Sequence, residues 1–452
     1  MAARHPRDWW HDIILRGIKL LNAFLMTAVF GAIWYRFFAL TIRDPFYRRG
    51  NYVVIFLFFL IYVTFGRLYD AFLVSYNRIS EMIYSQVLAA LIADVLMYIV
   101  CMLLKKGVPP VWPFLLLLLC EIAVSTVWSL CAHRFYFRFF KAKKTAIIWD
   151  MRKGLQQLIS SYGLSKKFNV VATPSAKECV KDLSVLDNVE TVFLTGVHSR
   201  DRNKIIKYCI ERNIDAFIIP RVGDVLMSSA RRIHMLHLPI LRLSRYKPQP
   251  EYVFFKRFFD IVLSLLAIII LSPVMIITAI AIKRDGGPAL YKQCRLTKDG
   301  KTFNVMKFRS MRVDAEKDGV ARLSTGDHDD RITPVGKVIR KVRIDELPQL
   351  FNILLGDMSI VGPRPERPEI AAQYEEEMPE FRLRLQAKAG LTGYAQVYGK
   401  YNTTPYDKLQ MDLMYIAQPS LVQDLRICFA TVKILFMPES TEGIEEGKTT
   451  AK

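Results

Sequence analysis

The sequence predicts a membrane protein built from an N-terminal bundle of four transmembrane helices, a central α/β domain and a mostly helical C-terminal domain. Three observations lead to this prediction. The chain has 452 residues, a length that typically corresponds to about three domains. Hydrophobic residues make up 52% of the chain although its net charge is +21. Four apolar runs lie in the first third, and one more follows after the middle.

The composition excludes several classes of protein. A chain this apolar can bury enough surface to fold, so intrinsic disorder is excluded. The seven cysteines are scattered and include no Cys-x-x-Cys pair, which excludes a disulfide scaffold and a cysteine-based zinc framework. A basic and apolar chain is typical of a protein that contacts anionic membrane lipids or phosphorylated ligands. We therefore expect no nucleic-acid partner.

Residues 1–144 contain four apolar segments, which predict four transmembrane helices. The segments are Leu20–Tyr35, Tyr52–Phe65, Met82–Leu104 and Trp112–Ala132. The third and fourth are long enough to cross a bilayer, and the first two need flanking residues to do so. The densest basic stretch follows the fourth segment, which predicts that this end is cytoplasmic. An even number of spans then places the N-terminus in the cytoplasm as well.

Two acidic residues, Asp94 and Glu121, lie inside the third and fourth segments. Ionisable groups at membrane depth are costly and often functional. A role in helix packing is an equally good interpretation, so the sequence assigns these two residues no chemistry.

Residues 145–250 alternate between strand-like and helix-like patterns. The strand-like runs are Ala146–Ile148, Asn169–Val171, Thr191–Leu194 and Ala216–Ile219. This alternation predicts a Rossmann-like α/β domain with a mostly parallel sheet. A nucleotide-binding domain of this kind needs a glycine-rich turn after its first strand, but here that strand continues into Trp149–Arg152. We expect a structural or regulatory role for this domain.

Residues 258–282 form a fifth apolar run, long enough to span a membrane. Basic residues flank it on both sides, Lys256 and Arg257 before it and Lys283 and Arg284 after it, which favours two cytoplasmic ends. Ser272 and Pro273 stand in its middle, where a proline breaks helical hydrogen bonding. The sequence predicts a re-entrant helix that enters the membrane and returns to the same face. A kinked transmembrane helix is the alternative.

The region after this run is rich in charged residues. It begins with a basic stretch that contains Lys292, Arg295, Lys301, Lys307, Arg309 and Arg312. Next to a membrane anchor, such a stretch favours phosphate or lipid contacts. Thr333 and Pro334 then predict the start of a helix over residues 335–355, with a kink near Pro348. By composition alone, Asp345 and Glu346 on this helix could be a solvated charge cluster.

The order of five short motifs favours a catalytic interpretation of these charges. The motifs are Lys307–Met311 (KFRSM), Asp345–Asn352 (DELPQLFN), Gly356–Ser359 (GDMS), Gly362–Glu366 (GPRPE) and Gly390–Gly393 (GLTG). The series resembles the bacterial sugar transferase family, the polyprenyl-phosphate hexose-1-phosphate transferases also called monotopic phosphoglycosyl transferases. The resemblance covers about residues 254–436. The preceding helices and α/β domain resemble the large form of this family, found in enzymes that start exopolysaccharide and capsule synthesis.

The resemblance implies a reaction and a location. It implies transfer of a hexose 1-phosphate from a UDP-hexose, with glucose or galactose as the hexose, to undecaprenyl phosphate, with release of UMP. It also implies a multi-pass protein of the inner (plasma) membrane whose catalytic domain, residues 251–437, lies on the cytoplasmic face and is monotopic. A homodimer is expected by the same resemblance. The alternative is a membrane scaffold or sensor whose catalytic domain is inert.

The resemblance also implies roles for individual residues. Asp345 corresponds to a nucleophile that forms a phosphosugar-aspartyl intermediate, a role that carboxylates fill in other phosphoryl transfers. Glu346 corresponds to a ligand of Mg²⁺. The expected contacts to substrate phosphates are Lys307, Arg309, Arg340, Arg343 and Arg364. Ser272 and Pro273 match the break in the family's re-entrant helix.

The chain departs from the family pattern near residue 390 and ends in two further predicted segments. Ala389 and Tyr394 stand where the family has proline and tryptophan, which leaves substrate choice at this loop open. Ser420 and Gln423 form a capping-box pattern ahead of an apolar helix over residues 421–436. We expect this helix at the membrane interface, with a buried core helix as the alternative. Residues 438–452 form a polar tail.

Overall fold

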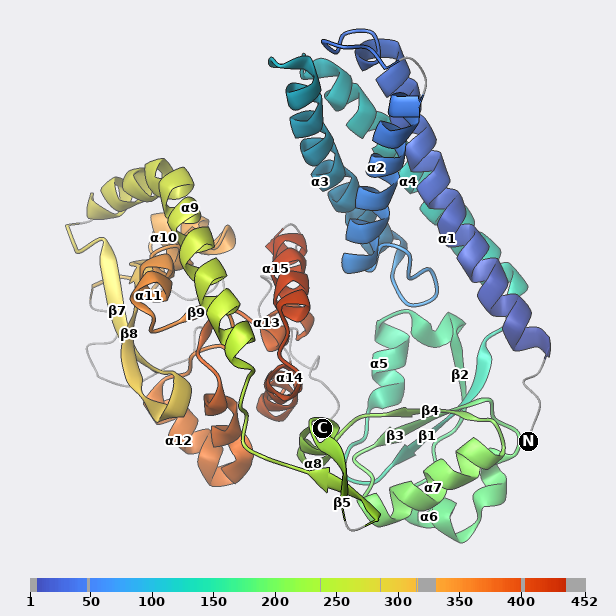
Figure 1. The fold of residues 1–452 in the computed structure, drawn as a ribbon. Coiled ribbons are helices and arrows are strands. Elements are labelled where there is room, and N and C mark those ends of the chain that lie inside the picture. The colour runs from blue at the N-terminus through green and yellow to red at the C-terminus, as the bar shows by residue number, and fades with distance from the viewer. Residues whose placement is uncertain are drawn as a thin grey trace. The chain divides into compact units, whose positions relative to one another are not determined.

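The computed structural model describes residues 6–46, 49–235, 237–284, 286–313, 315, 331–399 and 403–435. The chain divides into two compact units, Met1–Ile219 and Pro220–Thr450 (Figure 1). The predicted polar tail over residues 438–452 lies outside the described residues.

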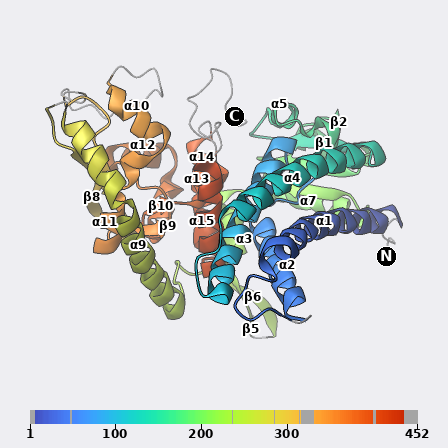
Figure 2. The same ribbon diagram turned by 90° about the horizontal axis from the view of Figure 1, so that it is seen from above.

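The first unit begins with four long apolar helices, as the sequence predicts. They are α1 (Pro6–Ile33), which continues as the π-helix η1 (Trp34–Phe38), α2 (Arg49–Leu68), α3 (Ile79–Lys105) and α4 (Trp112–Phe139). Each has the length and composition to cross a membrane. The ring of His11 near the start of α1 packs against Tyr136 and Phe140 at the end of α4. The bundle therefore runs up and down, with both of these ends on one side (Figure 2).

A chain of buried polar side chains joins the four helices. The hydroxyl of Tyr62 on α2 donates to Asn22 Oδ1 on α1 at 2.7 Å, and Asn22 Nδ2 donates to Gln86 Oε1 on α3 at 3.2 Å. Gln86 Nε2 in turn lies 3.4 Å from Ser129 Oγ on α4. Because lipid offers these groups no hydrogen bonds, such contacts favour one arrangement of the helices.

The acidic residues Asp94 on α3 and Glu121 on α4 face each other inside this bundle. Asp94 is 5% exposed and Glu121 is fully buried. Their carboxyl groups lie close enough to interact electrostatically, and none of their four oxygens has a hydrogen-bond partner among the described residues. Two buried carboxyl groups this close repel each other if both are charged, so the pair fits helix packing only if at least one of them carries a proton.

This pair leads to a stability prediction. We expect Glu121→Gln to unfold at nearly the same temperature as the wild type in detergent, because the amide has nearly the same shape as the carboxyl and is an uncharged polar neighbour of Asp94. Glu121→Leu leaves the buried Asp94 without a polar neighbour and should lower stability by about 1–3 kcal/mol. Thermal unfolding of the full chain measures both variants. Equal melting temperatures for Glu121→Leu and the wild type would contradict a stabilising role for the pair.

The second half of the first unit is a parallel α/β domain. Its strands are β1 (Lys143–Trp149), β2 (Phe168–Ala172), β3 (Thr191–Thr195) and β4 (Asp215–Ile218), in the order β2-β1-β3-β4. Between them lie α5 (Leu155–Ser161), η2 (Leu164–Lys166), α6 (Ala176–Lys181), η3 (Leu183–Leu186) and α7 (Ser199–Glu211). The predicted parallel sheet is confirmed. Its strand order is the flavodoxin-like one rather than the 3-2-1-4 order of a Rossmann sheet.

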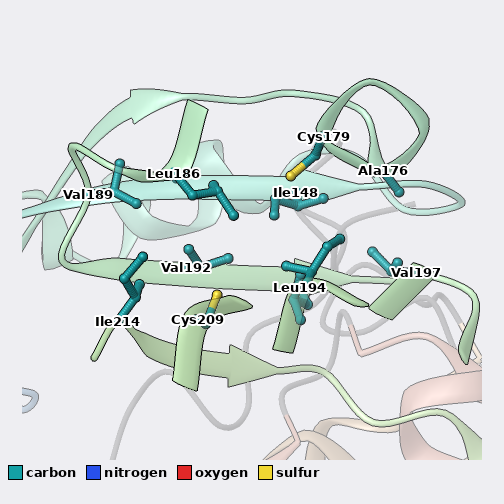
Figure 3. Close-up of a cluster of buried hydrophobic side chains, with 12 residues drawn as sticks. Ile148, Ala176, Cys179, Leu186, Val189, Val192, Leu194, Val197, Cys209 and Ile214 are labelled. Carbon is teal, nitrogen blue, oxygen red and sulfur yellow. The ribbon is translucent and has the colours of Figure 1, made fainter. Parts of the chain in front are cut away.

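The core of this domain lies between the sheet and two of its helices. Ile148 on β1 and Val192 on β3 are fully buried against Cys179 of α6 and Cys209 of α7 (Figure 3). Both cysteines are free thiols. Burial raises the pKa of each to about 11, so they act as small apolar residues of the core.

The α/β domain contacts the loop between α2 and α3. Lys167 Nζ donates to Ser75 Oγ at 3.0 Å and lies over the ring of Tyr76, while Arg78 donates to the carbonyl of Ser161 at 3.1 Å. Burial, and then the charge of Lys143, lowers the pKa of Lys167 to about 7. This loop and the α/β domain therefore lie at the same end of the bundle.

The second unit begins earlier than the sequence places its boundary. Residues 220–250, assigned above to the α/β domain, contain α8 (Val222–Ser228) and an antiparallel hairpin of β5 (Arg231–Met235) and β6 (Leu238–Arg242). Val222 and Val225 pack in one cluster with Leu409 and Leu413 of α14 (Pro405–Ala417). The apolar face of α8 thus joins this segment to the C-terminal unit.

A long apolar helix, α9 (Pro250–Lys283), follows this hairpin and precedes a mostly helical region. The remaining elements are β7 (Leu290–Leu296), η4 (Lys298–Gly300), β8 (Thr302–Phe308), α10 (Pro334–Lys341), η6 (Ile344–Glu346), α11 (Gln349–Leu355), β9 (Ser359–Val361), α12 (Pro368–Glu377), η7 (Pro379–Gln386), β10 (Gly390–Thr392), α13 (Tyr394–Tyr398), α14 and α15 (Leu421–Leu435). This arrangement confirms the predicted helical C-terminal part.

Helix α9 remains helical through Pro273, where the sequence predicts a break. The Ser272 hydroxyl donates to the carbonyl of Ile269 at 2.8 Å. Figure 1 shows that the helix bends toward its C-terminal end. The proline is therefore accommodated inside a bent, continuous helix, since a neighbouring serine can hydrogen-bond a carbonyl that a proline leaves free.

Helix α15 begins as the capping pattern predicts, because the amide of Gln423 donates to Ser420 Oγ at 3.2 Å. Its inner face includes the fully buried Ile427, whereas Val422 is 67% exposed and Leu425 is 52% exposed. The helix is therefore part of the core on one face, and its apolar outer face fits a position at the membrane interface.

Candidate active site

The two predicted catalytic carboxylates lie on a short turn between two helices. Thr333 Oγ1 accepts a hydrogen bond from the amide of Gly336 at 2.9 Å, which confirms the predicted helix start. However, α10 ends at Lys341, Arg343 adopts a left-handed backbone with φ 55°, and Asp345 and Glu346 lie on η6. The prediction of one kinked helix over residues 335–355 is therefore wrong. A left-handed residue ends a helix, and after the short 3-10 segment η6 the α-helix resumes only at Gln349.

Apolar residues on either side of the acidic pair attach this turn to α9. Ile344 and Leu347 pack with Met275 and Ile282 of α9, in a cluster that also contains Phe308 of β8. The two carboxylates therefore lie directly beside the C-terminal half of the long apolar helix.

Asn352 joins the helix after the acidic pair to the strand that carries Lys307. Its Oδ1 accepts a hydrogen bond from the amide of Met306 at 2.9 Å, and its Nδ2 donates to the carbonyl of Asn304 at 2.9 Å. Asn352 is 1% exposed, so α11 and β8 are held by a buried amide. The last residue of the DELPQLFN motif thus has a structural role.

Glu346 lies between two cations. Its Oε1 is 3.0 Å from Lys307 Nζ and 3.4 Å from Arg364 Nη2, and its side chain is 14% exposed. Burial opposes its ionisation, but Lys307 and Arg364 outweigh burial and hold the pKa of this carboxyl far below its ordinary value. Glu346 is therefore ionised throughout the physiological range.

Asp345 has a different environment although it is the next residue. Burial, and then the charge of Glu346, raises the pKa of Asp345 to about 6, against the opposing effect of Lys307, Arg340 and Arg364. At neutral pH it is a carboxylate that is less well stabilised than Glu346. Adjacent carboxyl groups with such different pKa values are a common feature of active sites in which the two groups have different roles.

A small pocket that opens to solvent lies beside Glu346. Its lining contains four charged residues and several backbone and apolar groups, namely Arg295, Lys307, Glu346, Arg364, Val305, Gln349, Pro365, Gly390 and Leu391. Three cations around one carboxylate leave a net positive charge, which suits an anionic ligand such as a diphosphate. Arg295 belongs to the basic stretch in the sequence, but no motif distinguished it from its neighbours.

The predicted phosphate contacts divide into two groups. Lys307 and Arg364 lie at the pocket, and Arg340 and Arg343 are close enough to influence the charges of Asp345 and Glu346, respectively. Arg309 is placed elsewhere, so its expected contact is not supported.

Arg309 instead organises the chain after α9. Its guanidinium donates to the carbonyls of Pro288 at 3.0 Å, Ile282 at 3.1 Å and Met311 at 3.4 Å, and the residue is 7% exposed. Strand β8 ends at Phe308, so the alternation that would place residues 307 and 309 on the same face does not extend to Arg309.

Comparisons with known proteins agree with this geometry. The profile of the family described as bacterial sugar transferase matches residues 251–438. A UDP-galactose-lipid carrier transferase of Erwinia amylovora is 30% identical over 360 residues, which cover 72% of this chain and 75% of that protein. The chain belongs to the bacterial sugar transferase family.

Other relatives of the bacterial sugar transferase family match over shorter regions. A UDP-N-acetylgalactosamine-undecaprenyl-phosphate N-acetylgalactosaminephosphotransferase of Aeromonas hydrophila is 38% identical over 236 residues, covering 51% of this chain and 55% of the relative. A UDP-glucose:undecaprenyl-phosphate glucose-1-phosphate transferase of Klebsiella pneumoniae is 35% identical over 253 residues, covering 54% of each. The chain thus spans about half the length of these two relatives.

A magnesium ion at this site would have to be held jointly by protein and substrate. Within the described ranges, no three His, Cys, Asp or Glu side chains form a metal cage. Mg²⁺ is commonly bound through one or two carboxylates together with substrate phosphates. Glu346, ionised and at the edge of the pocket, has the chemistry to hold the ion in this way, and the ion would neutralise phosphate charge there.

Proposed function

We propose that this chain transfers a hexose 1-phosphate from a UDP-hexose to undecaprenyl phosphate and releases UMP, as the membrane step that starts exopolysaccharide or capsule synthesis. The observation that carries the proposal is the placement of Asp345, a carboxylate with a raised pKa, beside Glu346, Lys307 and Arg364 and next to the apolar helix α9. The functions named for the relatives from Aeromonas, Klebsiella and Erwinia support the reaction class.

The proposed reaction has two displacements at one phosphorus atom. A carboxylate oxygen of Asp345 attacks the phosphorus that carries the hexose, and the bond from this phosphorus to the bridging oxygen breaks, so that UMP leaves with the electron pair. An oxygen of undecaprenyl phosphate then attacks the same phosphorus and displaces the carboxylate of Asp345. The products are UMP and the hexosyl diphosphate lipid, and Asp345 is regenerated.

The cationic residues have distinct roles in this scheme. Lys307 and Arg364 face the pocket and balance the negative charge of the diphosphate as the first bond breaks. Before substrate binds, the same two groups are held by Glu346 at 3.0 and 3.4 Å. They are therefore positioned in advance, and little reorganisation is needed at the moment of reaction.

We also propose that α9 is re-entrant and that the catalytic unit lies on the cytoplasmic face. A straight helix of 34 residues is about 51 Å long and would carry one end away from the unit. In this structure the unit holds both ends. Arg257 donates to the carbonyls of Ile353 and Leu354 at 2.6 and 2.8 Å, and Arg309 donates to that of Ile282.

A proline substitution tests this topology. We expect Pro273→Leu to favour full insertion of α9 and to lower UMP release, because it removes the residue that disfavours a straight helix. Labelling of a single cysteine introduced in the unit, from either side of sealed vesicles, measures the topology. Exclusively cytoplasmic labelling with unchanged turnover in Pro273→Leu would show that this proline does not set the re-entrant path.

The proposed reaction is tested by UMP release from the purified full chain with undecaprenyl phosphate, Mg²⁺ and a panel of UDP-sugars. The panel should include UDP-glucose, UDP-galactose and UDP-N-acetylgalactosamine, because the relatives differ in the sugar that their names specify. We expect release with one of the hexose donors. No release with any donor would favour the alternative of an inert scaffold or sensor.

A further inference from the structure

The loop that carries Arg364 is held by its main-chain carbonyls. Four consecutive carbonyls, those of residues 363–366, each accept one hydrogen bond. The donors, in chain order of their acceptors, are the amide of Gly390 at 2.9 Å, Arg384 Nη2 at 2.9 Å, Arg295 Nη1 at 3.1 Å and the amide of Leu296 at 2.9 Å. Because Pro363 and Pro365 have no N–H, this loop has few donors of its own with which to form regular structure. Donors from elsewhere in the chain fix its path.

Arg384 is the donor to the carbonyl of Arg364 itself. It lies on η7 and is 5% exposed. Its Nη2 also lies 2.7 Å from Asp412 Oδ2 on α14, and Asp412 is 1% exposed. One buried guanidinium therefore joins the main chain at Arg364 to a buried carboxylate.

The burial of this ion pair calls for an explanation other than stability. The cost of removing two charges from water offsets most of their attraction, so buried pairs contribute little net stability compared with apolar residues of similar size. What a pair with a planar guanidinium does supply is fixed geometry. The geometry fixed here is that of the main chain from which the Arg364 side chain extends.

Arg384 does not line the pocket that contains Glu346 and Lys307, whereas Arg364 does. The Arg364 side chain is 43% exposed and reaches Glu346 at 3.4 Å. Arg384 also lies 3.7 Å from Glu366, which is 3.8 Å from Arg295 of the pocket. Its shortest connection to the pocket is the 2.9 Å hydrogen bond to the carbonyl of Arg364.

We propose that Arg384, held by Asp412, is a positioning residue that fixes the main chain of Arg364 and so presents its guanidinium to the substrate diphosphate. The catalytic consequence of this inference rests on the proposed function. The contact between Arg384 and the carbonyl of Arg364 is independent of that function. A displacement of about 1 Å in a positioning group can cost about 100-fold in rate. Because the charge of Arg364 is kept, the loss should appear mainly in kcat.

The test uses a variant that avoids an unpaired buried charge. The double variant Arg384→Met/Asp412→Leu removes both charges, a change that folded proteins commonly tolerate. We expect kcat for UMP release to fall about 10- to 100-fold, with the KM for the UDP-sugar changed less than about threefold. Arg382→Met is the matched control, because Arg382 is an exposed arginine of the same element, and it should leave both constants unchanged.

A second comparison separates positioning from a general loss of structure. In an Arg364→Met background the double variant should cost almost nothing more, since the group that it positions is already gone. Equal losses in the two backgrounds would overturn the proposal, as would an unchanged kcat in the double variant.

A readout that needs no activity distinguishes this proposal from the proposed function. Hydrogen exchange of a peptide covering residues 359–367 should be faster in the double variant than in the wild type and in Arg382→Met. If exchange is faster in the double variant and the wild type releases no UMP, the positioning contact is supported and the proposed reaction is wrong. Unchanged exchange would overturn the contact itself.

Discussion

Asp345→Asn is expected to lower UMP release by about 1,000-fold or more, because it removes the only nucleophile in the proposed first displacement. The asparagine amide has almost the shape of the carboxyl and cannot form a stable acyl phosphate. The measurement is the initial rate of UMP release by the full chain with saturating donor and acceptor. The melting temperature of the variant should stay close to that of the wild type. The raised pKa of Asp345 shows that the fold does not stabilise its charge well, so removing that charge should cost little stability.

The covalent intermediate gives this prediction a sharper form. Incubated with donor and no acceptor, the wild type should release about one equivalent of UMP per active site and gain the mass of one hexose phosphate. Asp345→Asn should show neither change. Glu376→Gln is the matched control, because Glu376 is an exposed carboxylate of the same unit, and it should behave as the wild type does. A hexose phosphate adduct on Asp345→Asn would place the nucleophile at another residue.

The sequence predicts the membrane helices and the parallel strands well for a physical reason. A lipid bilayer imposes a minimum apolar length, and a buried parallel strand requires a short β-branched run. Both leave a local signature, and α3, α4, β1 and β3 lie where those signatures are. The family motifs similarly identify Lys307, Glu346 and Arg364, which the structure brings together.

Other features depend on contacts that no local pattern records. The break before the acidic pair depends on the left-handed backbone of Arg343, and an arginine gives no sign of that conformation. The boundary at residue 220 depends on α8 packing against α14. Arg295 and Arg384 donate hydrogen bonds to the loop of Arg364 from 70 and 20 residues away in the chain. Their role is therefore apparent only in the folded structure.

Glu346→Gln is expected to have the second largest effect, a fall in kcat/KM of about 100- to 1,000-fold. The substitution keeps the shape of the side chain but removes the negative charge that holds Lys307 and Arg364. It also removes the proposed ligand of Mg²⁺. The measurement is UMP release as a function of Mg²⁺ concentration, with Glu376→Gln as the control that leaves the curve unchanged.

The shape of the Mg²⁺ titration distinguishes the two roles of Glu346. If Glu346 holds the ion, the half-saturating Mg²⁺ concentration should rise by about 10-fold or more in Glu346→Gln, and direct binding of Mn²⁺ in the presence of donor should weaken in parallel. If Glu346 acts only by positioning Lys307 and Arg364, kcat should fall while the half-saturating Mg²⁺ concentration stays unchanged. In that case the ion would be held by the substrate phosphates and another carboxylate. Asp345 is the nearest candidate, because it lies close enough to Glu346 for the charge of Glu346 to raise the pKa of Asp345.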